Sequence, residues 1–302
     1  MNFPSAAAYH AYRPAAWLGV RGADAAGFLQ GQFTNDLRPV EAGSAVYGLW
    51  LDQKGKVLAD SFIGRDTAGN GFWLASMASA AAAIRQRLED YIIADDVTLE
   101  DATRETSGVA LMGAGTGAWL AAAPRPGRYF RGRRGSMENW EWIFPASAAA
   151  EVASALTGGR AWDADEVERR RILAGIPSVP ADIGPADLPN EGGLDADAIS
   201  YTKGCYLGQE IMARLKSKGR IRRRLHRVSG SGPPPAAPIA LWQDGTKVGE
   251  LRTVAPDEAG SGFVGLALLS LAALRAAVPL ALAAGGPARI AFQPRPGRAI
   301  SI

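Results

Sequence analysis

The stretch Lys203-Gly204-Cys205-Tyr206-Leu207-Gly208-Gln209-Glu210 is the most informative part of this 302-residue chain, because it holds the chain's only cysteine. A lone thiol cannot form an intrachain disulfide, nor can it supply a four-cysteine zinc or iron–sulfur cage. It is therefore either a buried filler residue or one reactive thiolate. A cation near a thiol lowers its pKa, and Lys203 lies two residues before the cysteine. The surrounding sequence favours the reactive thiolate.

The composition around this motif is that of an ordinary soluble protein. Hydrophobic residues make up 47% of the chain and charged residues 21%, which is typical of globular domains. The length suggests two or three subdomains. The first residues show no signal-peptide pattern, and no apolar run approaches the ~18 residues of a membrane span. One free thiol fits a reducing compartment. We therefore expect a cytoplasmic protein without membrane association, and a monomer.

Basic charge is concentrated in two places, although the net charge is only +3. One group directly follows the cysteine motif and the other lies in the middle of the chain. Their members are Lys216, Lys218, Arg220, Arg222, Arg223, Arg224 and Arg227, and Arg125, Arg128, Arg131, Arg133 and Arg134. Each group is either a solvated face or a surface for a polyanion, such as nucleic acid or a polycarboxylate tail. The group that follows the cysteine motif contains no aromatic residue and no RNA-binding signature accompanies either group, so nucleic acid is not expected as the primary partner.

The residue pattern alternates between strand-like and helix-like segments, which predicts an α+β fold of mixed or antiparallel sheets with helices. The clearest unit is a hairpin of strands 45–51 and 56–64, joined by a turn that ends at Gly55. Further strands are predicted at 17–21, 72–75, 97–101, 108–112 and 138–144. Helices are predicted at 24–30, 79–91, 115–122 and 165–174. Residues 177–200, rich in proline and glycine, are expected to form a long ordered loop.

A glycine-rich segment at 109–117 has the outline of a nucleotide-binding loop, with a strand entering a turn and a helix. The fingerprint breaks at Ala118, where a further glycine is required. We therefore predict only a tight strand-to-helix turn there.

Four segments together resemble one known family. They are Gln30-Gly31-Gln32-Phe33-Thr34-Asn35-Asp36, Asp52-Gln53-Lys54-Gly55-Lys56, Arg171-Ile172-Leu173-Ala174-Gly175-Ile176-Pro177 and the cysteine octapeptide. Their order and spacing resemble the YgfZ family of folate-binding proteins, which act in the assembly or repair of iron–sulfur proteins. That family resembles in fold the T-protein of the glycine cleavage system, an aminomethyltransferase. The resemblance covers residues 20–227, and Leu173 departs from it, because many relatives have glutamate there.

The resemblance implies a T-protein-like folate-binding fold and a set of domain boundaries. Residues 1–228 would form the folate-binding region, with subdomains of about 1–103 together with 175–228, and about 104–174. Residues 229–238, which include a run of three prolines, would form a linker. Residues 239–302 would form a small C-terminal β-barrel-like domain.

The resemblance also implies a cofactor, tetrahydrofolate or a one-carbon derivative, in a central cavity. Tyr47 and Asp60 fall on T-protein positions that contact folate, and the aspartate there serves the aminomethyl chemistry. The residues expected to bind the cofactor are Tyr47, Asp60, Asn35, Asp36, Glu141, Gln209 and Arg223. Those expected to carry the chemistry are Cys205, Lys203 as its activator, and Asp60. The basic residues are expected to hold the glutamate tail of folate.

Two functions remain open at this point. The first is a tetrahydrofolate-binding factor that supports iron–sulfur proteins, including those that modify tRNA, through Cys205. Its partners would be folate and iron–sulfur client or assembly proteins. The second is a folate-dependent aminomethyltransferase, in which Asp60 would matter and Cys205 would be incidental. Whether the chain is an enzyme is left open. With one cysteine and only His10 and His226 as histidines, no stably bound metal is expected.

Overall fold

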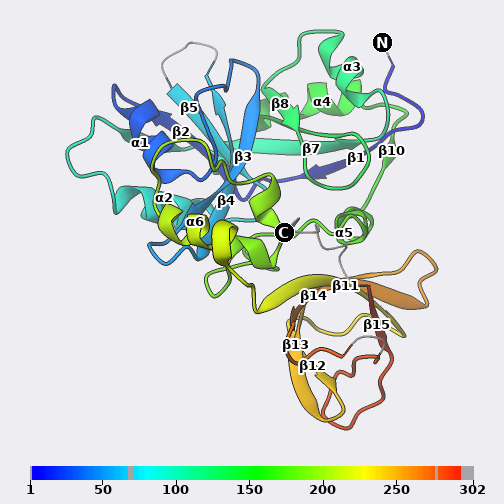
Figure 1. Ribbon diagram of the computed structural model, residues 1–302. Helices are drawn as coiled ribbons and strands as arrows, with labels where there is room; N and C mark the ends of the chain where they lie inside the picture. Colours follow the sequence, from blue (N-terminus) through cyan, green and yellow to red (C-terminus); the bar gives the residue numbers. More distant parts are fainter. Residues whose placement is uncertain (1, 67–70, 276–277, 294–302) are drawn as a thin grey trace.

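Three five-stranded sheets organise the described part of the chain, two in its upper half and one below them (Figure 1). The structure is a computed structural model that describes residues 2–66, 71–275 and 278–293. Helices cover the outer faces of the two upper sheets, and the lower sheet contains the last described strand, β15, Ile290–Gln293 (Figure 1). This arrangement is the predicted α+β class.

The first sheet is antiparallel throughout and contains the predicted hairpin. In spatial order its strands are β3 (Ala45–Leu51), β4 (Val57–Arg65), β5 (Gly71–Ser76), β2 (Ala16–Arg21) and β6 (Thr98–Asp101). Helices α1 (Ala25–Gln32) and α2 (Ala81–Glu89) pack on one face, where Leu18, Val20 and Ile84 are fully buried. Alternate residues of β2 point the other way, toward the second sheet.

The turn of the β3–β4 hairpin is fixed by two features of its sequence. Gly55 has a φ of +72°, which glycine adopts without steric cost. The Asp52 carboxylate accepts hydrogen bonds from the backbone N–H groups of Lys54 and Lys56, each at 2.8 Å. The hairpin pairs Tyr47 with Phe62 and Leu49 with Asp60. Tyr47 and Asp60 therefore lie on neighbouring strands within reach of each other.

The second sheet combines one strand from the start of the chain with four strands from residues 106–161. In spatial order its strands are β10 (Arg160–Ala161), β1 (Ala8–Tyr12), β7 (Thr106–Met112), β9 (Asn139–Pro145) and β8 (Arg128–Arg131). Helices α3 (Thr116–Ala121) and α4 (Ala149–Ala155) accompany it, with Trp119 and Trp142 in its core. Strand β1 pairs with β7, so the first strand of the chain does not belong with the predicted 1–103 subdomain. Strand β8 was not predicted, because its sequence, Arg-Tyr-Phe-Arg, does not alternate between apolar and polar residues.

The third sheet shows that the predicted linker boundary was wrong. In spatial order its strands are β12 (Ile239–Gln243), β13 (Thr246–Pro256), β14 (Gly262–Ser270), β11 (Arg223–Ser231) and β15 (Ile290–Gln293). Strand β11 pairs with β14 over its whole length, so Ser229 to Ser231 lie inside a strand. Only residues 232–238 connect β11 to β12. Isolated bridges at Trp242–Ala281 and Leu280–Ile290 draw this unit together.

The three sheets meet around one hydrophobic cluster. Tyr47 and Leu49 of β3, Phe130 of β8 and Leu225 of β11 all belong to it. The predicted long loop crosses this centre, with two short helical turns at η3 (Pro189–Glu191) and η4 (Leu194–Ala196). The remaining elements are α5 (Ala164–Leu173), α6 (Gln209–Lys218), η1 (Thr103–Glu105) and η2 (Ala146–Ala148). Because the centre is shared, side chains from distant segments converge there.

Candidate functional site

A cavity of about 230 Å³ lies where the first sheet, the second sheet and the start of the long loop meet. It brings together three residues that the sequence predicted for one pocket: Tyr47, Asp60 and Glu141. They come from β3, β4 and β9. Other lining residues come from the segment before β9, from α5 and from the 176–179 stretch. The cavity is therefore a product of packing between units and not of any single motif.

Asp60 is held in this cavity by three hydroxyl groups. Its Oδ1 accepts hydrogen bonds from Ser76 and Ser79, at 2.6 and 2.7 Å, and its Oδ2 accepts one from the Tyr47 hydroxyl at 3.0 Å. Burial raises the pKa of Asp60, and the hydroxyl donors oppose that rise only in part. Burial also raises the pKa of Tyr47 well above its usual value, with Asp60 adding to the rise. Asp60 is therefore a destabilised carboxylate aimed at a small polar cavity.

Glu141 reaches the same cavity, but its carboxylate is already engaged. It accepts hydrogen bonds from Arg134 Nε and from the Tyr12 hydroxyl, each at 2.6 Å. Its side chain is 1% exposed, and that of Arg134 is 17% exposed. A buried carboxylate needs such partners, because an unpaired charge there would cost several kcal/mol. Direct contact between Glu141 and a ligand stays a prediction, and the structure shows Glu141 as an ion-pair partner of Arg134.

Arg133 lines the cavity, although the sequence indicated it only as one member of a basic group. Its guanidinium lies 3.9 Å from the centre of the Tyr47 ring, and it forms an ion pair with Asp197. A guanidinium stacked on an aromatic ring in this way is attracted by the electrons of the ring. Ser76, Ser79 and Arg133 were thus missed as site residues. The repeated serines around Met77 were the available signal for the two hydroxyl donors.

Asn35 and Asp36, which the sequence placed at the cofactor, lie behind the cavity and not among its lining residues. The Asn35 amide donates to the carbonyls of Tyr47, at 2.9 Å, and Asp197, at 3.0 Å. It therefore fixes the backbone on which Tyr47 is mounted. Asp36 forms an ion pair with Arg38 at 2.6 Å. That arginine lowers the pKa of Asp36 below its usual value.

Cys205 is exposed, on the loop that leads into α6. The loop is fastened to the rest of the protein on both sides of the cysteine. Leu207 N donates to the Gly31 carbonyl at 3.2 Å. Gly208, with a φ of +86°, begins α6 where the backbone passes close to the 52–55 turn. Three of the four segments that carry the resemblance to the family, at 30–36, 52–56 and 203–210, therefore meet at this loop. Exposure excludes the buried-filler interpretation of Cys205.

Lys203 fastens the same loop through its side chain. Its ammonium donates to the carbonyls of Gln30, Phe33 and Asn35, at 2.6, 2.5 and 3.0 Å. The residue is 4% exposed. Burial lowers the pKa of Lys203 to about 8. The predicted role of Lys203 was to activate the thiol, but the structure directs its ammonium at backbone carbonyls. Its demonstrated contacts are those of a clamp on the cysteine loop.

Gln209 and Arg223, the last two predicted cofactor contacts, do not line the cavity. Gln209 is the first residue of α6. Arg223 lies on β11 and forms ion pairs with Asp187 and Glu191, at 3.0 and 2.8 Å. Its charge is used to attach the third sheet to the long loop. A folate contact through Arg223 would require these two carboxylates to give up their partner.

Two further findings concern metals and membranes. Within residues 2–66, 71–275 and 278–293, no group of three or more His, Cys, Asp or Glu side chains is arranged to hold a metal ion. None of the helices in these ranges is long and apolar enough to span a bilayer.

The arrangement of the three sheets defines the class of fold to which this chain belongs, which is that of the aminomethyltransferase T proteins. Residues 14–125 match the GCVT N-terminal domain, and residues 222–295 match the CAF17 C-terminal beta-barrel domain. The glycine cleavage aminomethyltransferase T of Bartonella henselae superposes with a TM-score of 0.74 over 89% of this chain and 79% of its own, at 20% identity. These matches confirm the predicted T-protein-like fold and the terminal β-barrel.

Two groups of relatives narrow this class further. The human mitochondrial "iron-sulfur cluster assembly factor IBA57" is 33% identical over 283 residues, which cover 83% of this chain and 74% of that protein. The "tRNA-modifying protein YgfZ" of Vibrio vulnificus strain YJ016 is 28% identical over 225 residues, covering 71% and 68%. The chain belongs to the IBA57/YgfZ family.

Proposed function

We propose that this protein is a tetrahydrofolate-binding factor that supports the assembly or repair of iron–sulfur proteins through Cys205. The observation that carries the proposal is the convergence of the family segments in space. One end of the β3–β4 hairpin presents Tyr47 and Asp60 to a cavity, and its other end supports the cysteine loop. Relatives of this chain are named for iron–sulfur cluster assembly and for tRNA modification, which supports the choice of client. Iron–sulfur client or assembly proteins would be its partners.

The cavity fits the ring end of a folate better than a whole folate. Its volume of about 230 Å³ lies below the ~300–1,000 Å³ of most small-molecule pockets. Asp60 can accept hydrogen bonds from N–H groups of the folate ring. Tyr47, whose own ring is contacted by the Arg133 guanidinium, can lie next to the folate ring. Arg133 and Arg134 supply positive charge for a carboxylate. Bound tetrahydrofolate would supply a carrier of one-carbon units, and these residues would orient it.

Exposure of Cys205 suits a step shared with another protein. A single thiol cannot hold a cluster in the usual four-cysteine manner, so any cluster contact would be transient or completed by a client. A thiol on an exposed loop can reach such a client, whereas a buried one could not. The clamp through Lys203 keeps that loop in one position.

Complementation tests the role of the thiol. In cells that lack their own protein of this family, Cys205→Ala is expected to restore less than about a tenth of the wild-type activity of an iron–sulfur enzyme, because the chain has no second thiol to replace it. The exposed Ser217→Ala on α6 is the matched control and is expected to restore activity fully. Full rescue by Cys205→Ala would show that the thiol has no essential role.

The aminomethyltransferase alternative keeps one observation in its favour. Asp60 is positioned and destabilised in the manner expected of a group that acts on a one-carbon carrier. Transfer of an aminomethyl group by the purified chain with glycine cleavage partners, lost in Asp60→Asn and kept in Cys205→Ala, would support this alternative.

A further inference from the structure

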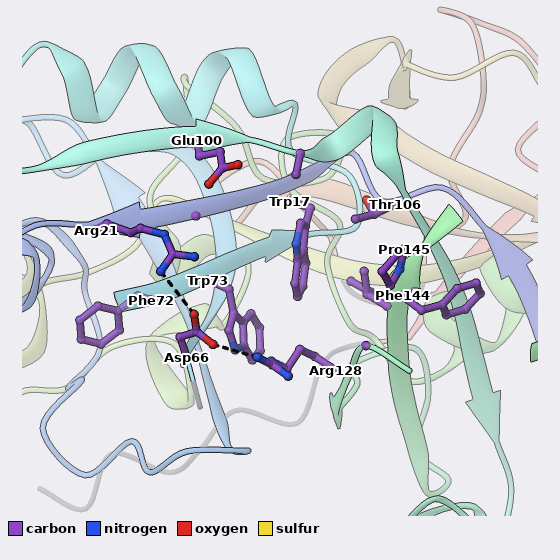
Figure 2. A pocket seen from close by; sticks show the side chains of 14 residues that line it. Trp17, Arg21, Asp66, Phe72, Trp73, Glu100, Thr106, Arg128, Phe144 and Pro145 are labelled. Atoms are coloured by element: carbon purple, nitrogen blue, oxygen red, sulfur yellow. Dashed lines mark hydrogen bonds and ion pairs between the residues drawn. The ribbon is translucent and has the colours of Figure 1, made fainter. Parts of the chain in front are cut away.

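A second and larger cavity, of about 400 Å³, lies on the other side of the contact between the two upper sheets. Its walls are the β2–β5–β6 edge of the first sheet and strand β9 of the second, with Gly127 and Arg128 before it (Figure 2). It shares no lining residue with the Tyr47–Asp60 cavity. Its volume falls within the range of small-molecule sites.

One wall of this cavity is aromatic. The indoles of Trp17 and Trp73 are stacked, with ring centres 5.3 Å apart and planes 16° apart, and both belong to the lining (Figure 2). Trp17 is only partly buried, so part of its indole is open to the cavity. Trp73 is 6% exposed, and its indole N–H finds no hydrogen-bond partner within the described residues. Flat indole faces suit a planar ring, and a buried N–H favours an acceptor.

The floor of the cavity exists because residue 19 is a glycine. Gly19 lies between Trp17 and Arg21 on β2, and all three face the same side of the sheet. A Cβ at Gly19 would meet only Glu100, at 3.7 Å, which is ordinary van der Waals contact. A larger side chain would therefore extend into the cavity without forcing the strands apart.

Charged groups of both signs border the aromatic wall. Asp66 lies between Arg21 and Arg128, at 3.5 and 2.8 Å (Figure 2). Glu100 pairs with Gly19 across the strands, so its carboxylate lies beside the floor. The arginines suit a phosphate or carboxylate, and Glu100 suits an amino group. The lining is thus complementary to a ring that carries both groups.

We propose that this cavity binds a planar, amino-substituted nitrogen heterocycle that carries a phosphate or carboxylate. The ring would lie over Gly19 against Trp17, with its amino group at Glu100 and its anionic group at Arg21 and Arg128. Purine mononucleotides and reduced folates both have this chemistry. The proposal does not depend on folate binding in the Tyr47–Asp60 cavity.

Contacts between aromatic rings link the two cavities. Ligand binding must therefore be measured in variants of both cavities. Trp73 contacts Phe130, with ring centres 5.0 Å apart, and Phe130 contacts Phe62 at 4.9 Å. Phe62 lines the Tyr47–Asp60 cavity. Along this path only Phe130 lies between the residues that line the two cavities. Gly19 is not part of the path, so a substitution there leaves these ring contacts in place.

The test is calorimetric titration of the full chain with GMP, AMP and 5-formyltetrahydrofolate. Gly19→Val places in the cavity a side chain that strands favour. It is expected to lower the affinity for the probe that binds by at least about tenfold. Arg21→Gln is expected to weaken it by about three- to tenfold, because one of two arginines remains. Asp60→Asn, in the other cavity, is expected to bind a nucleotide probe as the wild type does. Thermal unfolding of each variant shows whether it is folded.

The outcomes separate the two sources of the ligand. A nucleotide lost in Gly19→Val and kept in Asp60→Asn supports the proposal with a purine nucleotide as ligand. Loss of 5-formyltetrahydrofolate alone in Gly19→Val supports it with a folate, and unchanged binding of that folate in Asp60→Asn would show that it does not need the Tyr47–Asp60 cavity. The proposal is overturned if none of the three probes binds at about 1 mM, or if a folded Gly19→Val binds them as the wild type does.

Discussion

Asp60 and Asp36 are two carboxylates whose surroundings differ at the scale of a single residue. Its three hydroxyl partners are neutral, so none of them balances its charge at close range. Asp36 is the opposite case, because Arg38 pairs with it directly and lowers its pKa. A carboxylate kept without a cationic hydrogen-bond partner in a cavity costs stability, and such a cost is typical of a group retained for function.

Asp60→Asn is therefore expected to separate binding from stability. Burial raises the pKa of Asp60, so as pH rises the unfolded chain releases this proton before the folded chain does. The charged form then lowers the free energy of unfolding at pH 7, and removing the charge should leave that free energy unchanged or higher. The difference should vanish as pH falls toward the usual aspartate pKa of 3.8. Tetrahydrofolate affinity should fall by about tenfold or more.

Fluorescence titration and thermal unfolding at pH 7 and at acidic pH measure both effects. Asp36→Asn is the matched control and should behave in the opposite way, with lower stability at pH 7 and unchanged folate affinity. Wild-type affinity in Asp60→Asn would remove Asp60 from the proposed site.

Lys203→Met tests the clamp on the cysteine loop. The change leaves three carbonyls without their donor, and buried unpaired groups cost ~1–3 kcal/mol each. We expect the free energy of unfolding in urea to fall by about 2–4 kcal/mol, whereas the exposed Lys218→Met should change it by less than about 0.5 kcal/mol. Equal stability of the two variants would mean that the clamp contributes nothing.

At the scale of elements, the glycine-rich turn between β7 and α3 shows why its outline misleads. The N–H groups of Gly115 and Gly117, which could receive a phosphate, instead donate to the Glu138 carboxylate at 2.9 and 3.0 Å. Hydrogen bonds from Trp140 and these N–H groups lower the pKa of Glu138. The chain thus fills its own anion-binding turn, which agrees with the prediction of a structural turn.

The start of α6 depends on Gly208 for two separable reasons. Its φ of +86° disfavours any other residue, and a Cβ there would lie 2.9 Å from the Asp52 carbonyl oxygen. Gly232 has the same φ of +86°, but no atom lies within 4 Å of a Cβ built on it. Gly232→Ala should therefore lower the free energy of unfolding by about 1–2 kcal/mol from backbone strain alone.

Gly208→Ala should cost at least ~1 kcal/mol more than Gly232→Ala, because the contact with the 52–55 turn is added to the strain. Urea unfolding of the two variants measures the difference. Equal costs would show that the cysteine loop does not press against this turn.

At the scale of the whole molecule, buried ion pairs attach the third sheet to the long loop and to α5. Arg171 of α5 contacts Asp182 of the long loop at 2.7 Å and Thr253 of β13 at 3.0 Å. Thr253 in turn donates to Asp182 at 2.7 Å. Arg252 and Arg223 extend the same junction to Asp187. The three units are thus joined through one loop that carries the acidic partners.

Arg171→Met is expected to lower the free energy of unfolding by about 3–5 kcal/mol, because it leaves a buried carboxylate without its cation. Arg85→Met breaks an exposed pair with Glu89 and should cost less than about 1 kcal/mol. Urea unfolding compares them. Adding Asp182→Asn to Arg171→Met should recover part of the loss, since burial raises the pKa of Asp182 and its charge is then the unpaired one. No recovery would point to lost packing.

Much of the fold could be read from local patterns. The hairpin 45–64 was predicted because alternating residues flank a turn with Gly55, and both features act over short distances. The boundary at 229–238 was not, because a run of serine and glycine resembles a linker whether or not strands lie beside it. Residues 8–12 were placed in the 1–103 subdomain but form β1 of the second sheet, since only tertiary pairing decides which segment joins which sheet.

The sequence by itself determined the family, the α+β class and three polar residues of the cavity, Tyr47, Asp60 and Glu141, because those follow from motif order and residue type. Tertiary structure alone decided what each polar side chain faces. Lys203 is adjacent to Cys205 in the chain, yet its ammonium is directed at carbonyls of a segment about 170 residues away. Arg223 looked like a cofactor ligand, yet it pairs with the carboxylates of the long loop. Charge and hydrogen bonding act through space, so a partner's identity depends on packing that local sequence does not encode.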